Sequence, residues 1–371
     1  MTVVRIHSLK TVNIRIPLDH PKVFSTKKIF YRDYTLVTIT TESGITGWAF
    51  VWGIPAVKTM IDMYRDLVIG ELATDRIKIW NKIYSQADRW DRSGIIMRAL
   101  SVIDIALWDS LGKYAGLPIH KLLGGCRDEI EVYYSGGYYP EDRSRKKDLL
   151  SSLEKELGQA KDRGFRAFKI KIGAVSPAVD NERIALARKT IGPDCRLMLD
   201  ANCGYTAETI IPMAQEFAKY NITWLEEPVA VDDITNCAYV AERIPVPVAL
   251  GENHFGKWQF AEILRQHAGR IIQADPTVMG GFTEYLNVTG LCSANGLMLA
   301  PHCFHDLSVQ LGLARPEIMM LEYMDAAGDV INIQKILQNP VMAVNGKVKA
   351  PDGQGHGLIL DQAAVKHYLY E

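Results

Sequence analysis

FRAFKIKIG (165–173) opens the stretch that decides the fold, because short apolar runs of this kind recur as far as residue 323. The later runs are CRLMLDAN (195–202), ITWLEEP (222–228), VPVALGEN (246–253), RIIQADP (270–276), GLMLAPH (296–302) and EIMMLEY (317–323). Segments with helical spacing of apolar residues separate them, such as TAETIIPMAQEFAKY (206–220). Strands that alternate with helices predict a parallel sheet, and seven units exceed what most open sheets hold. The stretch therefore predicts a β/α barrel.

A polar side chain ends each of the seven runs. These residues are Lys171, Asp200, Glu226, Glu252, Asp275, His302 and Glu322. Neighbouring members lie roughly 20 to 30 residues apart, which is close to one strand plus one helix. A single Asp or Glu after a strand is more often a helix cap or a loop residue. Because all strands of a parallel barrel point the same way, seven in phase predict an active site at its C-terminal face.

The flanking segments have other patterns. Strand-like alternation in VVRIHSLKTVNIRI (3–16) and YTLVTITT (34–41) encloses a basic, Pro-interrupted segment, and helical spacing follows over 55–115. LPIHKLLGG (117–125) carries the Pro and paired Gly of a domain junction. From about residue 328 the alternation stops, and a Gly- and Pro-punctuated tail has room to fold back on the first domain.

The composition excludes several classes of protein. A length of 371 residues predicts two domains or one large barrel with attachments. Lys and Arg number 42 against 43 Asp and Glu, a net charge of -1, so we expect neither nucleic acid nor a membrane surface as partner. No window approaches the ~18 apolar residues of a membrane span, and the first residues lack a secretory signal. Six scattered cysteines without a Cys-x-x-Cys pair predict reduced thiols and a cytoplasmic location.

Asp200, Glu226 and Glu252 follow three consecutive strands. Three carboxylates that face one point repel one another unless a cation neutralises them. Oxygen ligands without Cys or His select Mg²⁺, or alternatively Mn²⁺, over zinc. Glu227 points to the opposite strand face from Glu226, so we expect it to support a ligand rather than to be one.

Candidate bases stand on either side of this cluster. Lys169 and Lys171 share one face of their strand, where two buried like charges would lower each other's pKa. Asp275 is placed to hold one ring nitrogen of His302, which turns the other toward substrate; His305 remains an alternative. Glu322 makes chemical sense beside an anionic substrate if it is protonated and donates a hydrogen bond.

This ordered set resembles the enolase superfamily, specifically its mandelate racemase subgroup. The resemblance extends from ALSVIDIALWDSLGKYAGLPIHKLLGG (99–125) through the Lys-x-Lys pair, LDAN, LEEP and GEN to Glu322. It implies an α/β fold, a modified TIM barrel (β/α)₇β over residues 126–327. An α+β capping domain over 1–125 would be completed by the C-terminal segment 328–371. The muconate-lactonizing and dipeptide-epimerase type fits less well, because it would place a lysine where this chain has Asp275.

The resemblance also implies the reaction. It is abstraction of the proton α to a carboxylate, with one Mg²⁺ per subunit stabilising the enediolate. Our first hypothesis is an acid-sugar dehydratase that eliminates a β-hydroxyl from an aldonate or aldarate to give a 2-keto-3-deoxy acid. A racemase, epimerase or sugar-lactone cycloisomerase is the alternative within the fold, and a non-catalytic Mg²⁺-binding regulatory protein is the alternative from another class. The family implies a homo-oligomer, from dimer to octamer.

Substrate contacts are expected from two cap loops and the barrel mouth. The loops are residues 20–33, which carry His20 and Lys22, and residues 52–55. Their basic and hydroxyl-bearing side chains suit a polyhydroxylated acid better than an aromatic one. Asn202 after the LDA run and Tyr138 early in the barrel complete the predicted contacts.

Overall fold

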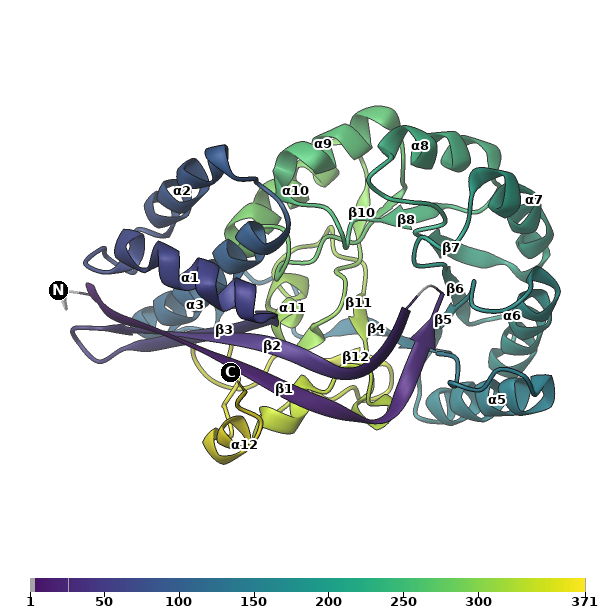
Figure 1. Ribbon diagram of the computed structural model, residues 1–371, viewed down its shortest axis with the longest axis horizontal. Helices are drawn as coiled ribbons and strands as arrows, with labels where there is room; N and C mark the ends of the chain where they lie inside the picture. The colour runs from purple at the N-terminus through teal and green to yellow at the C-terminus, as the bar shows by residue number, and fades with distance from the viewer. Residues whose placement is uncertain (1–3, 26, 371) are drawn as a thin grey trace.

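The computed structural model describes residues 4–25 and 27–370 and consists of a cap beside a barrel (Figure 1). The cap sheet is antiparallel in the order β1-β2-β3. Its strands are β1 (Ile6–Phe24), β2 (Lys27–Thr41) and β3 (Thr46–Trp52). The cap helices are α1 (Pro55–Val68), α2 (Arg76–Gln86), α3 (Gly94–Ala115) and α4 (Ile119–Leu122), with a 3₁₀ turn η1 (Ala87–Arg89).

The barrel contains eight parallel strands joined by helices. The strands are β4 (Ile130–Gly136), β5 (Ala167–Lys171), β6 (Arg196–Asp200), β7 (Ile222–Glu226), β8 (Val248–Leu250), β9 (Ile271–Ile272), β10 (Met298–Leu299) and β11 (Leu321–Tyr323). The helices are α5 (Lys146–Asp162), α6 (Pro177–Ile191), α7 (Ala207–Phe217), α8 (Ile234–Arg243), α9 (Gly256–Gln266), α10 (Gly281–Ala294) and α11 (His305–Gly312), with η2 (Ala218–Tyr220) after α7.

The strand order confirms the predicted (β/α)₇β architecture. The sheet runs β10-β9-β8-β7-β6-β5-β4-β11. Met319 N donates to Leu299 O at 2.9 Å, which brings the chain entering β11 beside β10. The first strand, β4, lies outside the seven apolar runs of the sequence, so the eighth strand is an addition from the structure.

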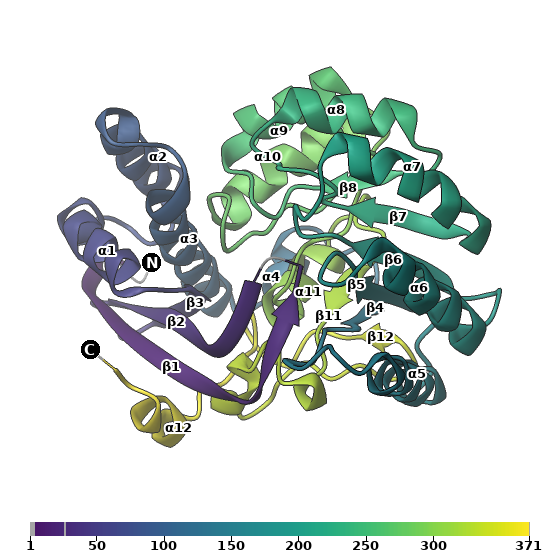
Figure 2. The same cartoon turned by 45° about the vertical axis from the view of Figure 1, so that its right-hand side comes forward.

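Within the segment 20–33, residues 20–24 and 27–33 belong to the two strands of a β-hairpin and do not form the loop expected from the Pro and charged residues. β1 and β2 stay paired as far as Phe24 and Lys27, with an irregularity in register between Pro17 and Lys22. The hairpin reaches from the cap toward the ends of β5 and β6 (Figures 1 and 2). Val23 N and Tyr139 O pair at 3.1 Å, so the hairpin tip is attached to the segment that follows β4.

The C-terminal segment packs against the cap. It contains η3 (Ala326–Gly328), η4 (Ile333–Ile336), β12 (Lys347–Val348), which pairs with β4, and α12 (Gln362–His367). His356 Nε2 lies 2.9 Å from Trp48 O, and Arg15 N donates to Tyr368 O at 2.9 Å. We propose domain boundaries at residues 125 and 327, because α4 ends just before the first and the tail contacts begin after the second.

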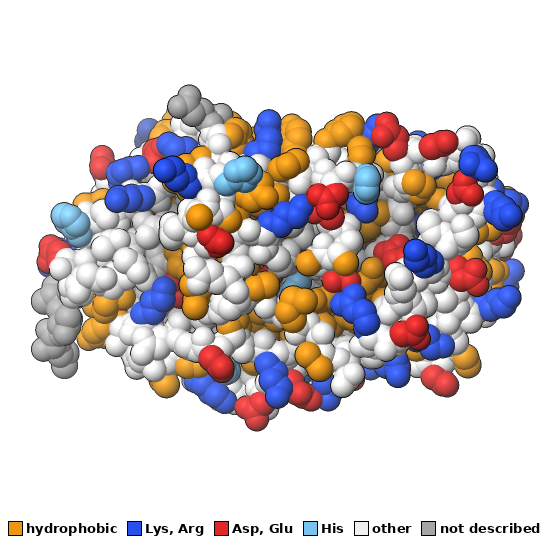
Figure 3. Space-filling view, turned by 90° about the horizontal axis from the view of Figure 1, so that it is seen from below, with side chains coloured by type: hydrophobic (Ala, Val, Ile, Leu, Met, Phe, Trp, Pro, Cys, Tyr) orange, Lys and Arg blue, Asp and Glu red, His pale blue; other side chains and the backbone are white. Residues whose placement is uncertain are grey.

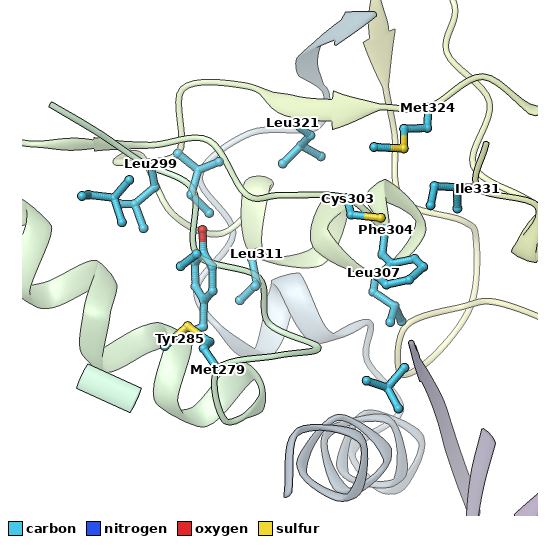
Figure 4. Close-up of a cluster of buried hydrophobic side chains, with 14 of the residues drawn as sticks. Met279, Tyr285, Leu299, Cys303, Phe304, Leu307, Leu311, Leu321, Met324 and Ile331 are labelled. Atoms are coloured by element: carbon cyan, nitrogen blue, oxygen red, sulfur yellow. The ribbon is translucent and has the colours of Figure 1, made fainter. Parts of the chain in front are cut away.

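A buried apolar cluster joins the last barrel units to the tail. It includes Cys303, Phe304, Met324 and Ile331 (Figure 4). The Phe304 ring lies 5.2 Å from that of Phe50 in the cap sheet, measured between centroids. This packing fixes the cap against the loop that follows β10.

The surface carries charges of both signs. On the face seen in Figure 3, acidic and basic side chains are interspersed, in keeping with the net charge of -1. Within residues 4–25 and 27–370, no helix combines the length and apolar character needed to cross a membrane.

Asn332 is the polar centre of the contact between tail and cap, and its replacement by leucine should destabilise the fold. The buried amide donates to Ile16 O and Pro17 O, both at 3.2 Å, and accepts from Tyr34 Oη at 3.1 Å. We expect Asn332→Leu to lower the free energy of unfolding by about 2 to 3 kcal/mol, because the buried Ile16 O and Tyr34 Oη both lose a hydrogen bond to the amide. Thermal or denaturant unfolding checks this. Asn295→Leu is the control, since Asn295 is exposed and its amide bonds only to Leu291 O; equal stability losses would contradict the assignment.

Candidate active site

Three carboxylates from neighbouring strands meet at the C-terminal end of the barrel. Asp200 ends β6 and Glu226 ends β7, and the two residues are direct partners in the sheet. Glu252 lies two residues beyond β8. One oxygen from each lies within 4.8 Å of the others, so the structure brings the predicted ligand set together.

The environment of these carboxylates fits a hard divalent cation. Asp200 and Glu226 are fully buried. Burial raises the pKa of Glu226 well above its ordinary value, and the charge of Asp200 adds to the effect. Among the described residues, the buried Oε2 of Glu252 has no hydrogen-bond partner. Clustered oxygen donors, one of them free of hydrogen bonds, are what Mg²⁺ requires from a protein.

Glu227 supports this cluster from the side. Its carboxylate accepts from Asn253 Nδ2 at 2.8 Å and from Cys203 Sγ at 3.4 Å. Burial raises its pKa to about 8, with a further contribution from the charge of Glu252. The three-carboxylate cluster does not include Glu227, which agrees with the supporting position expected from the sequence.

Glu252→Gln should weaken metal binding. The substitution keeps the shape of the side chain and removes one of three negative charges, so we expect the Kd for Mg²⁺ to rise by about 100-fold. Isothermal titration with Mg²⁺ measures this directly. Glu262→Gln on α9 is the matched control, because Glu262 lies outside the cluster and pairs with Arg265. Unchanged affinity in Glu252→Gln would rule out Glu252 as a ligand.

Lys169 and Lys171 lie on one face of β5, as the strand period predicts. Lys171 Nζ lies 2.5 Å from Asp200 Oδ2. Lys169 Nζ lies 2.6 Å from Glu226 Oε1 and 2.7 Å from Glu322 Oε1. Both ammonium groups are buried, and Lys171 alone of the pair lines the cavity above the cluster.

The expected lowering of the Lys171 pKa is wrong for this state of the protein. Burial lowers the pKa of Lys171, but the surrounding groups, Asp200 foremost with Tyr138 and Glu226, together outweigh burial, and the pKa lies above its ordinary value. The sequence showed Lys169 as a neighbouring like charge. It did not show that the carboxylate of Asp200 would lie 2.5 Å from Lys171 Nζ, close enough to outweigh the effect of Lys169 on the pKa.

His302 stands at the other side of the cluster. Its Nδ1 lies 2.9 Å from Asp275 Oδ2, as predicted, and its Nε2 lies 3.4 Å from Glu252 Oε2. Asp275 is held in turn, because its Oδ1 accepts from Thr277 N and Thr277 Oγ1, both at 2.7 Å. Burial lowers the pKa of His302, but the negative charges of Glu252 and Asp275 outweigh it and raise the pKa to about 10.

The alternative histidine does not reach the site. His305 is buried at the start of α11, with Nε2 3.1 Å from Val341 O. It is absent from the residues that line the cavity. His305 is therefore a hydrogen-bonded core residue.

Glu322 differs from the neutral donor expected from the sequence. Its oxygens accept from Ser135 Oγ at 2.7 Å and Cys303 N at 2.8 Å, in addition to the ion pair with Lys169. Burial raises the pKa of Glu322, but the positive charges of Lys169 and His302 outweigh it and hold the pKa well below its ordinary value. Glu322 is thus an ionised acceptor, because the fold places a buried lysine against it.

A cavity of about 350 Å³ lies between barrel and cap, lined by Glu252 of the cluster, Lys171 and His302. Asn202 and Tyr138 line it, as predicted. The predicted substrate contacts His20 and Lys22 lie outside it, which corrects the sequence-based assignment. His20 is exposed on β1, and Lys22 lines a neighbouring cavity, because the hairpin turns other side chains inward.

Several lining residues were not predicted as contacts. Phe24, Lys27, Ile29 and Arg32 line the cavity from the segment 20–33 named from the sequence. The lining residues outside the predicted segments and sites come from α3, the barrel loops and the tail: Arg98, Cys203, Asn253, Val278, Met324 and Ile331. Trp52 belongs to the second cap loop named from the sequence. Arg98 had one detectable signal, a single guanidinium within the largely buried helix α3.

Comparison with protein-family models agrees with this geometry. A model described as "Mandelate racemase / muconate lactonizing enzyme, N-terminal domain" matches residues 6–124. A second, described as "Enolase C-terminal domain-like", matches residues 152–364. The chain belongs to the mandelate racemase/muconate lactonizing enzyme family of the enolase superfamily. The family resemblance seen in the sequence motifs is confirmed.

Relatives within the mandelate racemase family have several activities. The chain is 33% identical to D-galactarolactone cycloisomerase of Agrobacterium fabrum, with 98% of each protein covered. It is 34% identical to arabinonate dehydratase of Saccharolobus solfataricus, over 78% of this chain and 77% of the relative. The crystal structure of a racemase from Streptomyces coelicolor with bound magnesium superposes with a TM-score of 0.91 at 28% identity, covering 98% of this chain and all of that one.

Proposed function

We propose that this protein is a Mg²⁺-dependent acid-sugar dehydratase, which converts an aldonate or aldarate to a 2-keto-3-deoxy acid. One observation carries the proposal. Lys171 and His302 stand at opposite ends of the three-carboxylate cluster, with Nζ 2.5 Å from Asp200 and Nε2 3.4 Å from Glu252. Two proton-transfer groups that flank one anionic cluster suit removal of a proton from one carbon and delivery of a proton to a departing group.

The residues of this chain would divide the reaction as follows. Asp200, Glu226 and Glu252 would hold the Mg²⁺, which would supply Lewis acidity that makes the carbon next to the substrate carboxylate more acidic. Lys171 Nζ would take the α-proton in its neutral form, which requires that the negative charge of Asp200 be taken up by the cation. His302 Nε2 gives a proton to the β-hydroxyl as the C–O bond breaks, while Asp275 holds Nδ1 and fixes the ring.

Lys169 and Glu322 have positioning roles in this scheme. Lys169 neutralises Glu226 and Glu322, which would otherwise repel each other in a buried site. Glu322 binds the backbone N of Cys303, which adjoins His302, and thereby holds the loop that carries the histidine. Asn202 and Tyr138 are proposed to bind substrate hydroxyls.

A cycloisomerase or epimerase is the second candidate. The observation that favours it is the match to D-galactarolactone cycloisomerase, which is 33% identical over 98% of both chains. The same two groups would serve this reaction: Lys171 would remove the α-proton, and His302 would deliver a proton without loss of water.

A panel of acid sugars with Mg²⁺ tests the proposal. We expect one or more aldonates or aldarates to give a 2-keto product, detected by carbonyl derivatisation, together with α-proton exchange in D₂O, detected by NMR. Exchange or inversion without a keto product would support the isomerase. No exchange with any mono- or diacid sugar would contradict the enzyme assignment and favour a non-catalytic Mg²⁺-binding protein.

A further inference from the structure

Two arginines from the cap, Arg32 on β2 and Arg98 on α3, face the active cavity without a carboxylate partner. Both line the cavity beside the three-carboxylate cluster. Both also line a second cavity of about 290 Å³ on the outer side of Trp52, so they form one wall between the two spaces. Across the described ranges, no Asp or Glu oxygen lies within 4 Å of either guanidinium, although many other cations of the chain form such pairs.

Arg32 is held in place by neutral contacts. Its Nε donates to Val330 O at 2.7 Å, and its guanidinium carbon lies 4.2 Å from the centroid of the Trp52 ring. These contacts fix the plane of the guanidinium without compensating its charge. The structure records no acceptor for the two Nη groups among residues 4–25 and 27–370.

Arg98 is less satisfied still. Its Nη1 is buried and has no hydrogen-bond partner in the described part of the chain. Burial lowers the pKa of Arg98, while the charges of Asp275 and Glu252 oppose that effect.

A partly buried guanidinium without a counter-charge destabilises the free protein, and a ligand that supplies the counter-charge removes this cost. Sugar hydroxyls would accept its hydrogen bonds but would leave both positive charges uncompensated. A carboxylate accepts from a guanidinium through two parallel hydrogen bonds and also neutralises its charge. Glu252 of the three-carboxylate cluster, Lys171 and His302 line the cavity from the barrel, and the two arginines line it from the cap. A substrate that spans the cavity therefore meets positive charge at its far end.

We propose that Arg32 and Arg98 form a subsite for a second carboxylate, so the substrate is a dicarboxylic acid sugar, an aldarate, rather than a monocarboxylic aldonate. This inference rests on the proposed function and specifies which of its two substrate classes the site takes. The carboxylate next to the carbon that loses the α-proton lies at the three-carboxylate cluster, and the distal carboxylate binds the cap arginines.

Matched pairs of acids test the subsite, because a hexarate and the hexonate of the same configuration differ only in a carboxylate or a hydroxymethyl group at carbon 6. The probes are galactarate with galactonate, glucarate with gluconate, and mannarate with mannonate, each with the Mg²⁺ enzyme. We expect kcat/KM for the hexarate to exceed that for its partner by about 100-fold, the usual effect of one buried ion pair.

Variants connect that preference to the arginines. Arg98→Met and Arg32→Met should each reduce the ratio of kcat/KM for hexarate over hexonate by about 30-fold or more. Arg98→Lys should reduce the ratio less than Arg98→Met does, because lysine keeps the positive charge and loses only the paired hydrogen-bond donors of the guanidinium. Arg92→Met is the matched control, since Arg92 precedes the same helix and lies against Tyr84 outside both cavities.

Each result decides between the proposals. Turnover of hexonates at rates equal to hexarates, or an unchanged ratio in both methionine variants with native thermal unfolding, would overturn the subsite and leave the dehydratase proposal standing. Absence of α-proton exchange with every acid in the panel would overturn the proposed function, and the subsite with it. A lower ratio in Arg92→Met equal to that in Arg98→Met would also count against the subsite.

Discussion

Lys171→Ala is expected to reduce α-proton exchange by at least about 1000-fold, within the range that a positioned general base contributes. Lys171 is the buried amine that lines the cavity at the three-carboxylate cluster. The nearby phenol of Tyr138 is a poor substitute, because burial raises its pKa to about 12. The measurement is the rate of deuterium incorporation at the carbon next to the carboxylate, followed by NMR in D₂O.

Metal binding separates this effect from damage to the site. Removal of the ammonium leaves Asp200, Glu226 and Glu252 in place, so Lys171→Ala should bind Mg²⁺ at least as tightly as the native chain. Lys155→Ala, an exposed lysine on α5, serves as the control for a lysine-to-alanine change. Exchange at the native rate in Lys171→Ala would refute the assignment of Lys171 as the base.

His302→Asn is expected to abolish formation of the 2-keto product, with a loss of about 100- to 10,000-fold. If His302 protonates the departing hydroxyl and Lys171 removes the α-proton, the variant should still exchange that proton with D₂O. Exchange without product is therefore the specific signature of this division of roles. The experiment measures keto product and deuterium incorporation in the same sample.

His267→Asn is the matched control for this variant. His267 is exposed at the end of α9 with a positive φ of 56°, a backbone conformation that asparagine tolerates. Full product formation by His302→Asn would exclude the histidine as the acid. Loss of both exchange and product would instead indicate that His302 removes the proton from the substrate isomer used.

The barrel was predictable from the sequence because its signals are local. Each β/α unit displays its strand as a short apolar run and its helix as a different period. Parallel strands share one direction, so a polar residue after each run had to lie at the same end of the barrel. This reasoning placed Asp200, Glu226 and His302 near one another although they are far apart in the chain. It missed β4, because the run IEVYYSG (130–136) is not followed by one of the charged or histidine side chains that marked the other seven strands.

The cap resisted prediction because its contribution depends on distant packing. The segment 20–33 has a composition typical of a loop, but pairing over β1 and β2 keeps it extended and turns His20 and Lys22 away from the cavity. Arg98 belongs to α3, a largely apolar helix whose sequence predicts a buried position in the core. Its position at the cavity follows from contacts between cap and barrel, such as the hydrogen bond of 2.8 Å from Trp80 Nε1 to Gly280 O.

By itself, the sequence determined the barrel, the cluster of acids that suits a divalent cation, and the two groups that flank it. Those features follow from residue type and from position along a strand, because residues at the C-terminal ends of parallel barrel strands lie close together. Only the tertiary structure decided the charges and the walls of the site. A pKa depends on which opposite charge lies within a few ångströms, as Asp200 does at Lys171 and Lys169 does at Glu322. The arginine wall likewise exists only because the hairpin, α3 and the tail pack over one cavity.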